Sequence, residues 1–231
     1  MKKKATKVPA DAGDVIQLEV SGKTLSASVQ GKGDCAVILG PGAGGTRMTP
    51  QLLAVAAALD PKRYTTLLFN FPYQEAKRSF PDAAPVLENT FTALARHARE
   101  HLGARTVILG GRSMGGRMAS MAVSSGAVAC DGLAFLAYPL HPPGQEEKIR
   151  DAHLAAIKVP MLFLQGTRDV FARLELLKGV VKKLGSRAEL KLFEDADHSF
   201  KTPRGAALNT KQTEAAMIAE LTDWLSRVGR D

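Results

Sequence analysis

Short apolar segments alternate with amphipathic helical segments along most of the chain, and this alternation constrains the fold more than any other feature. The first clear example is a continuous apolar run at residues 36–39, followed by helical periodicity at about 50–59. Continuous apolar runs are typical of strands that are covered on both faces, as in parallel sheets. Strands that alternate with helices form βαβ units. The sequence therefore predicts an α/β fold with a mainly parallel sheet and helices on both faces.

The same alternation continues to the end of the chain. Further strands are expected at residues 65–69, 106–109, 132–138, 161–165 and 189–193. Further helices are expected at residues 85–102, 115–125, 172–184 and 213–228, with one helical turn at 153–157. Before the first buried strand, two alternating segments at 15–20 and 23–29 flank a Ser-Gly turn, which predicts an antiparallel hairpin at the sheet edge.

The length and charge of the chain bound its domain organisation. Its 231 residues are enough for one large domain, and no linker divides them. We expect a single domain over residues 14–231, preceded by a flexible basic tail at residues 1–13. The net charge is +8, but four lysines of the tail supply half of it. This distribution favours a solvated tail over a specific nucleic-acid surface.

Targeting signals and cysteine usage indicate the compartment. No apolar segment approaches the ~20 residues that span a bilayer, and no apolar core of a secretion signal follows the N-terminal lysines. Cys35 and Cys130 lie far apart and form no C-x-x-C motif, which is typical of a reducing compartment. We therefore expect a cytoplasmic protein without a membrane partner, while the sequence leaves the oligomeric state open.

A serine lies in a glycine-rich turn between a predicted strand and a predicted helix. The segment 111–115 reads Gly-Arg-Ser-Met-Gly, which matches the G-x-S-x-G pattern of a nucleophile elbow. Such a turn strains the backbone and lifts the serine hydroxyl above the sheet. Glycines at 111 and 115 fit a close approach of strand and helix. We interpret Ser113 as a nucleophile; the alternative is a glycine-rich turn that only packs tightly.

Two later strand ends supply an acid and a histidine in the chain order that an α/β-hydrolase triad requires. Asp169 follows the strand at 161–165, and His198 follows the strand at 189–193. Ligands of such sheets bind at the carboxyl ends of the strands, where these residues would meet. We expect His198 to take the serine proton and Asp169 to orient the imidazole. Asp195 and Asp197 are competing acids that we expect to shape the histidine loop.

A glycine-rich loop at residues 40–45 follows the third strand and is the expected oxyanion-binding segment. A developing oxyanion needs two backbone N–H donors, which we assign to Ala43 and Met114. The loop also contains the G-x-G-x-x-G spacing of dinucleotide-binding proteins, but the next strand ends in Phe-Asn-Phe without the acid that this site requires. The lysine of a P-loop is missing as well. No nucleotide or other cofactor is therefore expected.

One further motif suggests a metal site. Residues 97–101 match the H-x-x-E-H signature of inverted zinc proteases. The two histidines lie beside the apolar stripe of a helix that we expect on the outside of the sheet, away from the strand ends. A charged outer helix face explains them better, so no metal is predicted.

These motifs together resemble the α/β-hydrolase superfamily, and in particular small dienelactone-hydrolase-like serine hydrolases of the KANL/Tex type. The resemblance runs from about residue 36 to 224. It rests on the segments 41–45, 69–73, 111–116, 138–144, 165–169 and 197–198. Two departures stand out: the family's usual His-Gly in the oxyanion loop is Pro41-Gly42 here, and dienelactone hydrolases proper use a cysteine where this chain has Ser113.

The resemblance implies an α/β-hydrolase fold. The ordered triad and the oxyanion loop predict a serine hydrolase acting on a small carboxylic ester or thioester. The stretch at 139–160 is too short for a cap domain, so we expect an open site. Phe71, Tyr73, Leu140 and His141 follow strand ends and are predicted to line the substrate pocket.

Two further features leave alternatives open. Arg112 and Arg168 flank catalytic positions, where they either favour an anionic acyl group or form surface ion pairs. The altered oxyanion loop and the basic tail also allow a non-catalytic interaction module with the same fold.

Overall fold

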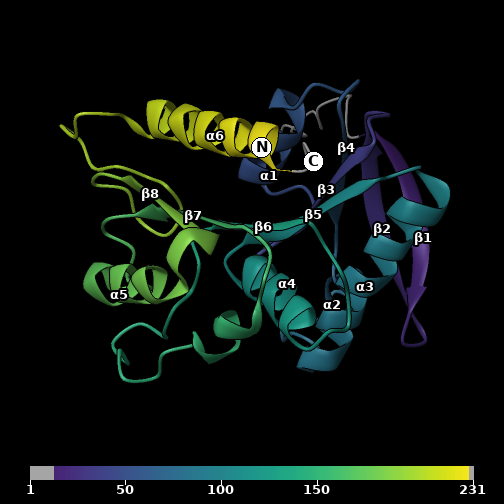
Figure 1. The fold of residues 1–231 in the computed structure, drawn as a ribbon, viewed down its shortest axis with the longest axis horizontal. Coiled ribbons are helices and arrows are strands. Elements are labelled where there is room, and N and C mark those ends of the chain that lie inside the picture. Colours follow the sequence, from purple (N-terminus) through teal and green to yellow (C-terminus); the bar gives the residue numbers. More distant parts are fainter. Residues whose placement is uncertain (1–12, 229–231) are drawn as a thin grey trace, which may run out of the picture.

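An eight-stranded sheet forms the centre of the computed structural model, which describes residues 13–228 (Figure 1). The strand order is β1-β2-β4-β3-β5-β6-β7-β8. Strands β1 and β2 form an antiparallel hairpin, β2 pairs antiparallel with β4, and the pairs from β4 to β8 are parallel. The predicted mainly parallel sheet with an antiparallel edge is confirmed. The tail predicted at residues 1–13 lies, apart from Gly13, outside the described residues.

The strands lie close to their predicted positions. They span β1 Asp14–Val20, β2 Lys23–Gln30, β3 Cys35–Gly40, β4 Tyr64–Phe69, β5 Thr106–Arg112, β6 Gly132–Leu136, β7 Met161–Gly166 and β8 Ala188–Phe193. Strand β5 runs three residues further than predicted because Gly110 and Gly111 continue the pairing with β3 and β6. Strand β6 ends two residues earlier than predicted, since Ala137 adopts a left-handed φ of +59°.

Helices cover both faces of the sheet, as predicted. They span α1 Pro50–Ala58, α2 Pro72–Glu75, α3 Ala84–His101, α4 Met114–Ser124, η1 Ala152–Ala156, α5 Leu174–Leu184, η2 Gly185–Arg187 and α6 Thr210–Arg227. Helices α1 and α6 lie on one face, and α3, α4 and α5 lie on the other (Figure 1). The short α2 and η2 were not expected from the sequence. No helix within residues 13–228 is long and apolar enough to cross a membrane.

Alternate residues of the central strands enter two separate apolar layers. In β3, Val37 and Leu39 pack with Trp224 of α6, whereas Ala36 and Ile38 pack with Phe91 of α3. All four strand residues are completely buried. A strand covered on both faces has no polar side, which explains the continuous apolar run in the sequence. Both layers end at the edge of the sheet where the parallel strands reach their carboxyl ends.

A buried network of hydrogen bonds connects α4 to η1. His153 Nε2 lies 2.8 Å from Ser120 Oγ and 3.4 Å from the Tyr138 hydroxyl. The Ser120 hydroxyl donates to the Arg117 carbonyl, and the Tyr138 hydroxyl donates to the Arg150 carbonyl. Each hydroxyl therefore accepts from His153, whose Nε2 must carry the proton. Burial, followed by the nearby charge of Arg117, lowers the pKa of His153 to about 4.

This shift predicts a pH dependence of stability. The pKa of His153 is about 4 in the folded protein against an ordinary value of 6.5, so between these values the unfolded chain binds more protons. Stability is therefore lost as the pH falls from 6.5 towards 4. Because His153 is partly exposed, solvent screening reduces the free energy that corresponds to its pKa shift to about 1–2 kcal/mol. The free energy of unfolding is measured by urea denaturation at pH 7 and at pH 4.5. Between these two pH values it should fall by about 1–2 kcal/mol less in His153→Gln than in the wild type. Equal losses would contradict the assignment.

Candidate active site

Ser113 occupies the turn between β5 and α4 in a backbone conformation that few non-glycine residues adopt. Its φ is +50° and its ψ is −117°. Such strained conformations cost about 1–3 kcal/mol and persist only where the surroundings enforce them. The Ser113 N–H donates to the Leu136 carbonyl of β6 at 2.9 Å, and the Ser113 carbonyl accepts from the Arg117 N–H at 3.2 Å. The neighbouring strand and the first turn of α4 thus hold the strained residue on both sides.

The glycines of this turn are required by the backbone of a neighbouring strand. A Cβ at Gly111 would lie 2.1 Å from the Gly40 carbonyl oxygen at the end of β3, and a Cβ at Gly115 would lie 2.2 Å from the same oxygen. The crowding expected from the turn's own strand and helix therefore comes mainly from β3. This contact places the loop after β3 directly beside Ser113.

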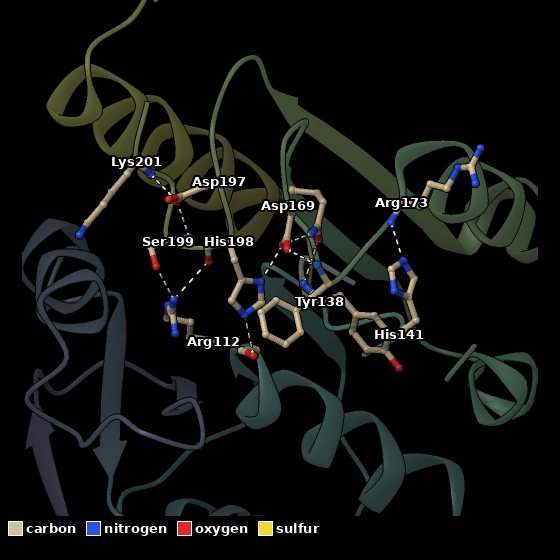
Figure 2. A network of polar contacts seen from close by, with 12 residues as sticks. Arg112, Tyr138, His141, Asp169, Arg173, Asp197, His198, Ser199 and Lys201 are labelled. Atoms are coloured by element: carbon tan, nitrogen blue, oxygen red, sulfur yellow. Dashed lines mark hydrogen bonds and ion pairs between the residues drawn. The ribbon is translucent and has the colours of Figure 1, made fainter. Parts of the chain in front are cut away.

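Ser113, His198 and Asp169 form a continuous chain of hydrogen bonds at this edge of the sheet. Ser113 Oγ lies 2.9 Å from His198 Nε2, and His198 Nδ1 lies 2.7 Å from Asp169 Oδ2 (Figure 2). The Asp169 side chain is completely buried, and that of His198 is 15% exposed. A carboxylate can only accept, so Nδ1 carries the imidazole proton. Nε2 is left with a lone pair directed at the serine hydroxyl.

Three donors fix the Asp169 carboxylate. Oδ1 accepts from the Phe171 N–H at 2.8 Å, and Oδ2 accepts from Gln165 Nε2 at 2.5 Å as well as from His198. Gln165 is itself held, because its Oε1 accepts from the Tyr138 N–H at 2.9 Å. Gln165 is fully buried near the end of β7. The sequence interpretation did not include Gln165, although a polar residue ending a buried apolar strand signals a specific partner.

His198 is held by the segment after β7 and by its own loop after β8. On one side, the Phe171 ring lies 4.3 Å from the imidazole between centroids, at 35°. On the other, Asp197 Oδ1 accepts from the N–H groups of Ser199 and Lys201 at 2.7 and 2.9 Å (Figure 2). Asp197 thus folds the loop instead of contacting the imidazole. Asp195 also lies in this loop at a φ of +58°, and its N–H donates to Thr167.

Arg112 joins the turn of Ser113 to the loop of His198. Its Nη2 donates to the His198 carbonyl at 3.2 Å and to Ser199 Oγ at 2.8 Å (Figure 2). Arg112 is half-buried and forms no ion pair with a described residue. Burial lowers the pKa of its guanidinium, and the charges of Asp169 and Asp197 oppose this shift. The predicted surface ion pair is therefore wrong for Arg112, which fixes the distance between two loops.

The loop at residues 40–45 borders the same space. A Cβ at Gly42 would lie 3.1 Å from Arg112 Nη1 and 3.6 Å from Ser113 Cβ. The N–H groups of Ala43 and Met114 have no hydrogen-bond partner within residues 13–228. Met114 is the first residue of α4, where backbone N–H groups carry partial positive charge. The assignment of these two N–H groups as oxyanion donors stays a prediction.

The short helix α2 holds the backbone of the loop at residues 40–45 through hydrogen bonds. The Tyr73 hydroxyl donates to the Ala43 carbonyl at 2.6 Å, and Gln74 Nε2 donates to the carbonyls of Gly42, at 3.3 Å, and Gly45. With its carbonyls held on one side, the loop presents the Ala43 N–H on the other. Tyr73, predicted to line the substrate pocket, thus positions the loop backbone in this structure.

The other three residues predicted to line the pocket are also buried. Phe71 and Leu140 are completely buried, and His141 is 2% exposed. His141 Nε2 accepts from the Arg173 N–H at 2.8 Å, while Nδ1 lies 2.9 Å from the Pro142 carbonyl (Figure 2). His141 therefore connects the loop after β6 to the segment after Asp169. In this structure these residues form the layer beneath the site, and direct contact with a substrate stays a prediction.

The residues of the alternative chemistries lie elsewhere. His97 and His101 are on the outer face of α3, with ring centroids 4.8 Å apart. No group of three or more potential metal ligands occurs among the described residues. Cys35 and Cys130 are free, and burial raises their pKa values to about 11 and about 12. Thiols that stay protonated at neutral pH are poor nucleophiles, so neither competes with Ser113.

The contact between Gly111 and Gly40 predicts a large loss of stability on substitution. Gly111 has a φ of +143°, and a Cβ there meets backbone atoms that cannot move aside cheaply. Gly111→Ala should reduce the free energy of unfolding by about 3 kcal/mol or more, measured by urea denaturation. Gly179→Ala in α5 is the matched control, because nothing lies within 4 Å of its Cβ position. It should stabilise by about 0.5–1 kcal/mol; similar effects at both glycines would contradict the steric argument.

Comparisons with known proteins agree with this architecture. A family model described as an alpha/beta hydrolase domain matches residues 33–226. An α/β serine hydrolase homologue from Coxiella burnetii is 21% identical over 93% of this chain and 96% of that chain, with a TM-score of 0.69. A dienelactone hydrolase from Anabaena variabilis is 17% identical over 93% and 97%, with a TM-score of 0.73.

A third solved structure is similar over nearly the same share of the chain. It is an α/β serine hydrolase without a lid from Xanthomonas campestris, 18% identical over 93% of this chain and 95% of that chain, with a TM-score of 0.70. At sequence identities this low, similarity to solved structures shows a shared fold. The match to the family model shows the family. The chain belongs to the α/β-hydrolase superfamily and is dienelactone-hydrolase-like in its fold.

Proposed function

We propose that this protein is a serine hydrolase that cleaves a small carboxylic ester or thioester through an acyl-enzyme. The observation that carries the proposal is the chain of hydrogen bonds from Ser113 to His198 at 2.9 Å and on to Asp169 at 2.7 Å. Membership of the α/β-hydrolase superfamily supports hydrolysis as the reaction class.

The first half-reaction follows from the protonation states of the three residues. His198 Nε2 takes the proton of the Ser113 hydroxyl while Oγ bonds to the carbonyl carbon. The imidazolium that forms is stabilised by the Asp169 carboxylate. The oxygen that gains negative charge accepts from the N–H groups of Ala43 and Met114, which need no rearrangement to donate.

The tetrahedral intermediate then collapses and completes the acylation, with the proton moving in the opposite direction. As the carbonyl re-forms, the bond to the leaving group breaks, and His198 returns its proton to the departing alkoxide or thiolate. A water molecule then gives a proton to His198 Nε2 and attacks the acyl-enzyme through the same oxyanion geometry. Collapse of this intermediate releases the carboxylic acid, and His198 returns the proton to Ser113 Oγ.

The surroundings of the site support a small substrate. Between β6 and η1 the chain forms one short loop that closes on itself where the Arg150 N–H donates to the Leu140 carbonyl at 2.8 Å. This connection is too short to hold a separate cap domain over Ser113. We infer an open site that takes small or flexible esters. The two free cysteines fit the cytoplasmic location that we expect for this enzyme.

Labelling with a fluorophosphonate probe tests the nucleophile. The wild type should react covalently, and Ser113→Ala should not react, because the probe needs a serine whose proton a base can take. Ser120→Ala is the matched control: Ser120 also lies beside a histidine, but its hydroxyl donates to a backbone carbonyl. This variant should label like the wild type. Equal labelling of wild type and Ser113→Ala would contradict the proposal.

A substrate panel separates the enzyme from the interaction module. Aryl esters and acyl thioesters of varied acyl length should be hydrolysed by the wild type and not by Ser113→Ala. If the folded wild type neither labels nor turns over any member of the panel, the non-catalytic module becomes the better explanation of the fold.

Gln165 should affect catalysis without touching the substrate. Gln165→Met removes one charge-assisted hydrogen bond to Asp169, which corresponds to about 10- to 100-fold in rate. We expect kcat to fall by that factor while KM stays within about twofold, since KM reports substrate binding here. Gln17→Met on the exposed face of β1 is the control and should leave both constants unchanged. A change in KM alone would show that Gln165 does not act through Asp169.

A further inference from the structure

Arg117 and Arg150 lie at the two ends of the hydrogen-bond network between α4 and η1. The network runs from the Arg117 carbonyl through Ser120, His153 and Tyr138 to the Arg150 carbonyl. Neither guanidinium forms an ion pair or a hydrogen bond with any residue of the range 13–228. The structure therefore brings together two positive charges that no carboxylate of the described chain neutralises.

The backbones of both arginines are fixed, so their side chains project from rigid positions. The Arg117 N–H donates to the Ser113 carbonyl at 3.2 Å within the first turn of α4. The Arg150 N–H donates to the Leu140 carbonyl at 2.8 Å, and the Arg150 carbonyl accepts from the Tyr138 hydroxyl at 2.8 Å. Because both backbones are fixed, binding of an anion would order only the two side chains.

This arrangement costs stability in the free protein. Both residues are half-buried, and Arg117 Nε is completely buried without a hydrogen-bond acceptor. Burial lowers the pKa of Arg150, and the charge of Arg117 lowers it further. The other titratable groups around them are Tyr138, His153 and Asp151. Asp151 is the one carboxylate among these groups, so the cluster holds two guanidiniums against a single carboxylate. A buried polar atom without a partner calls for an explanation, and a ligand that completes it is one such explanation.

The pair lies close to the nucleophile. Arg117 follows Ser113 by four residues, which is about one helical turn or roughly 6 Å along the axis of α4. Tyr138, which holds Arg150, also donates its N–H to Gln165, the residue that orients Asp169. Arg117 thus lies about one helical turn from Ser113 along the chain, and Arg150 is linked through Tyr138 and Gln165 to Asp169.

We propose that Arg117 and Arg150 together bind a phosphate group carried by the substrate. The inference rests on the proposed function for the substrate itself, whereas the anion site stands on the geometry alone. A phosphate monoester carries about −1.5 to −2 charges at neutral pH and offers three acceptor oxygens. Two guanidiniums match that charge and donate in the forked geometry that phosphate oxygens accept.

Binding of inorganic phosphate to the full chain tests the anion site. Isothermal titration calorimetry should show one site in the wild type, and Arg117→Met and Arg150→Met should each raise its Kd by about tenfold or more. The exposed Arg96→Met is the matched control, and it should leave the Kd unchanged. Ser113→Ala should still bind phosphate, because the site does not include the nucleophile. Thermal unfolding of each variant, together with the milder Arg117→Lys, separates lost binding from lost folding.

The inference is overturned by either of two binding results. Either the wild type binds no phosphate at millimolar concentration, or a variant that carries both Arg117→Met and Arg150→Met binds it as tightly as the wild type does.

Turnover tests whether the phosphate belongs to the substrate. Aryl esters with a phosphonate at increasing distance from the ester carbon, in the acyl or the alcohol part, are compared with neutral esters of equal length. At the best distance, the ratio of kcat/KM for charged over neutral ester should reach at least about tenfold in the wild type and fall towards one in the two arginine variants. Arg96→Met should keep the wild-type ratio.

The outcomes of the two experiments separate this inference from the proposed function. Ester hydrolysis without a preference for phosphonate esters overturns the substrate role and leaves the proposed function standing. Failure of labelling and of all turnover, with phosphate binding that still depends on Arg117 and Arg150, overturns the proposed function and the substrate role but supports the anion site.

Discussion

The close contact between the end of β3 and the turn of Ser113 is the constraint on which the rest of the site depends. Gly111 and Gly115 both lie against the carbonyl oxygen of Gly40, at distances that exclude a Cβ on either residue. The contact fixes the strained turn and brings the loop after β3 beside the serine. One backbone approach therefore determines where the serine and the loop N–H of Ala43 lie relative to each other, before any side chain takes part.

The histidine side of the site is held by side chains instead. Arg112, next to the serine, donates to the backbone of the loop after β8, while Gln165 and Asp169 hold the imidazole from β7. The two sides meet in the hydrogen bond between Ser113 and His198 and in those that Arg112 donates to the loop after β8. Their relative position thus depends on strand order, because β3, β5, β6, β7 and β8 are neighbours in the sheet and end at one edge.

The sequence could predict what depends on local pattern. Apolar runs, turn residues and the order of Ser113, Asp169 and His198 at strand ends indicated the fold and the residues that meet there. It could not predict which partner a buried polar side chain chooses. Gln165, Arg112 and Tyr73 find theirs through tertiary contacts, and Arg112 and His198 are 86 positions apart. A position after a strand end does not determine which way a side chain points, and the structure buries both Phe71 and Leu140.

Two serines at helix α4 lie beside a histidine: Ser113 precedes its first residue and Ser120 lies within it. Comparing them shows what geometry adds to residue type. Asp169 places the proton of His198 on Nδ1, so Nε2 can accept from Ser113. At the second pair the Ser120 hydroxyl already donates to a backbone carbonyl, and His153 must donate through Nε2. A base that cannot accept the serine proton cannot activate it. The third partner, a carboxylate in one case and carbonyls in the other, therefore decides which serine can react and which one only holds the helix.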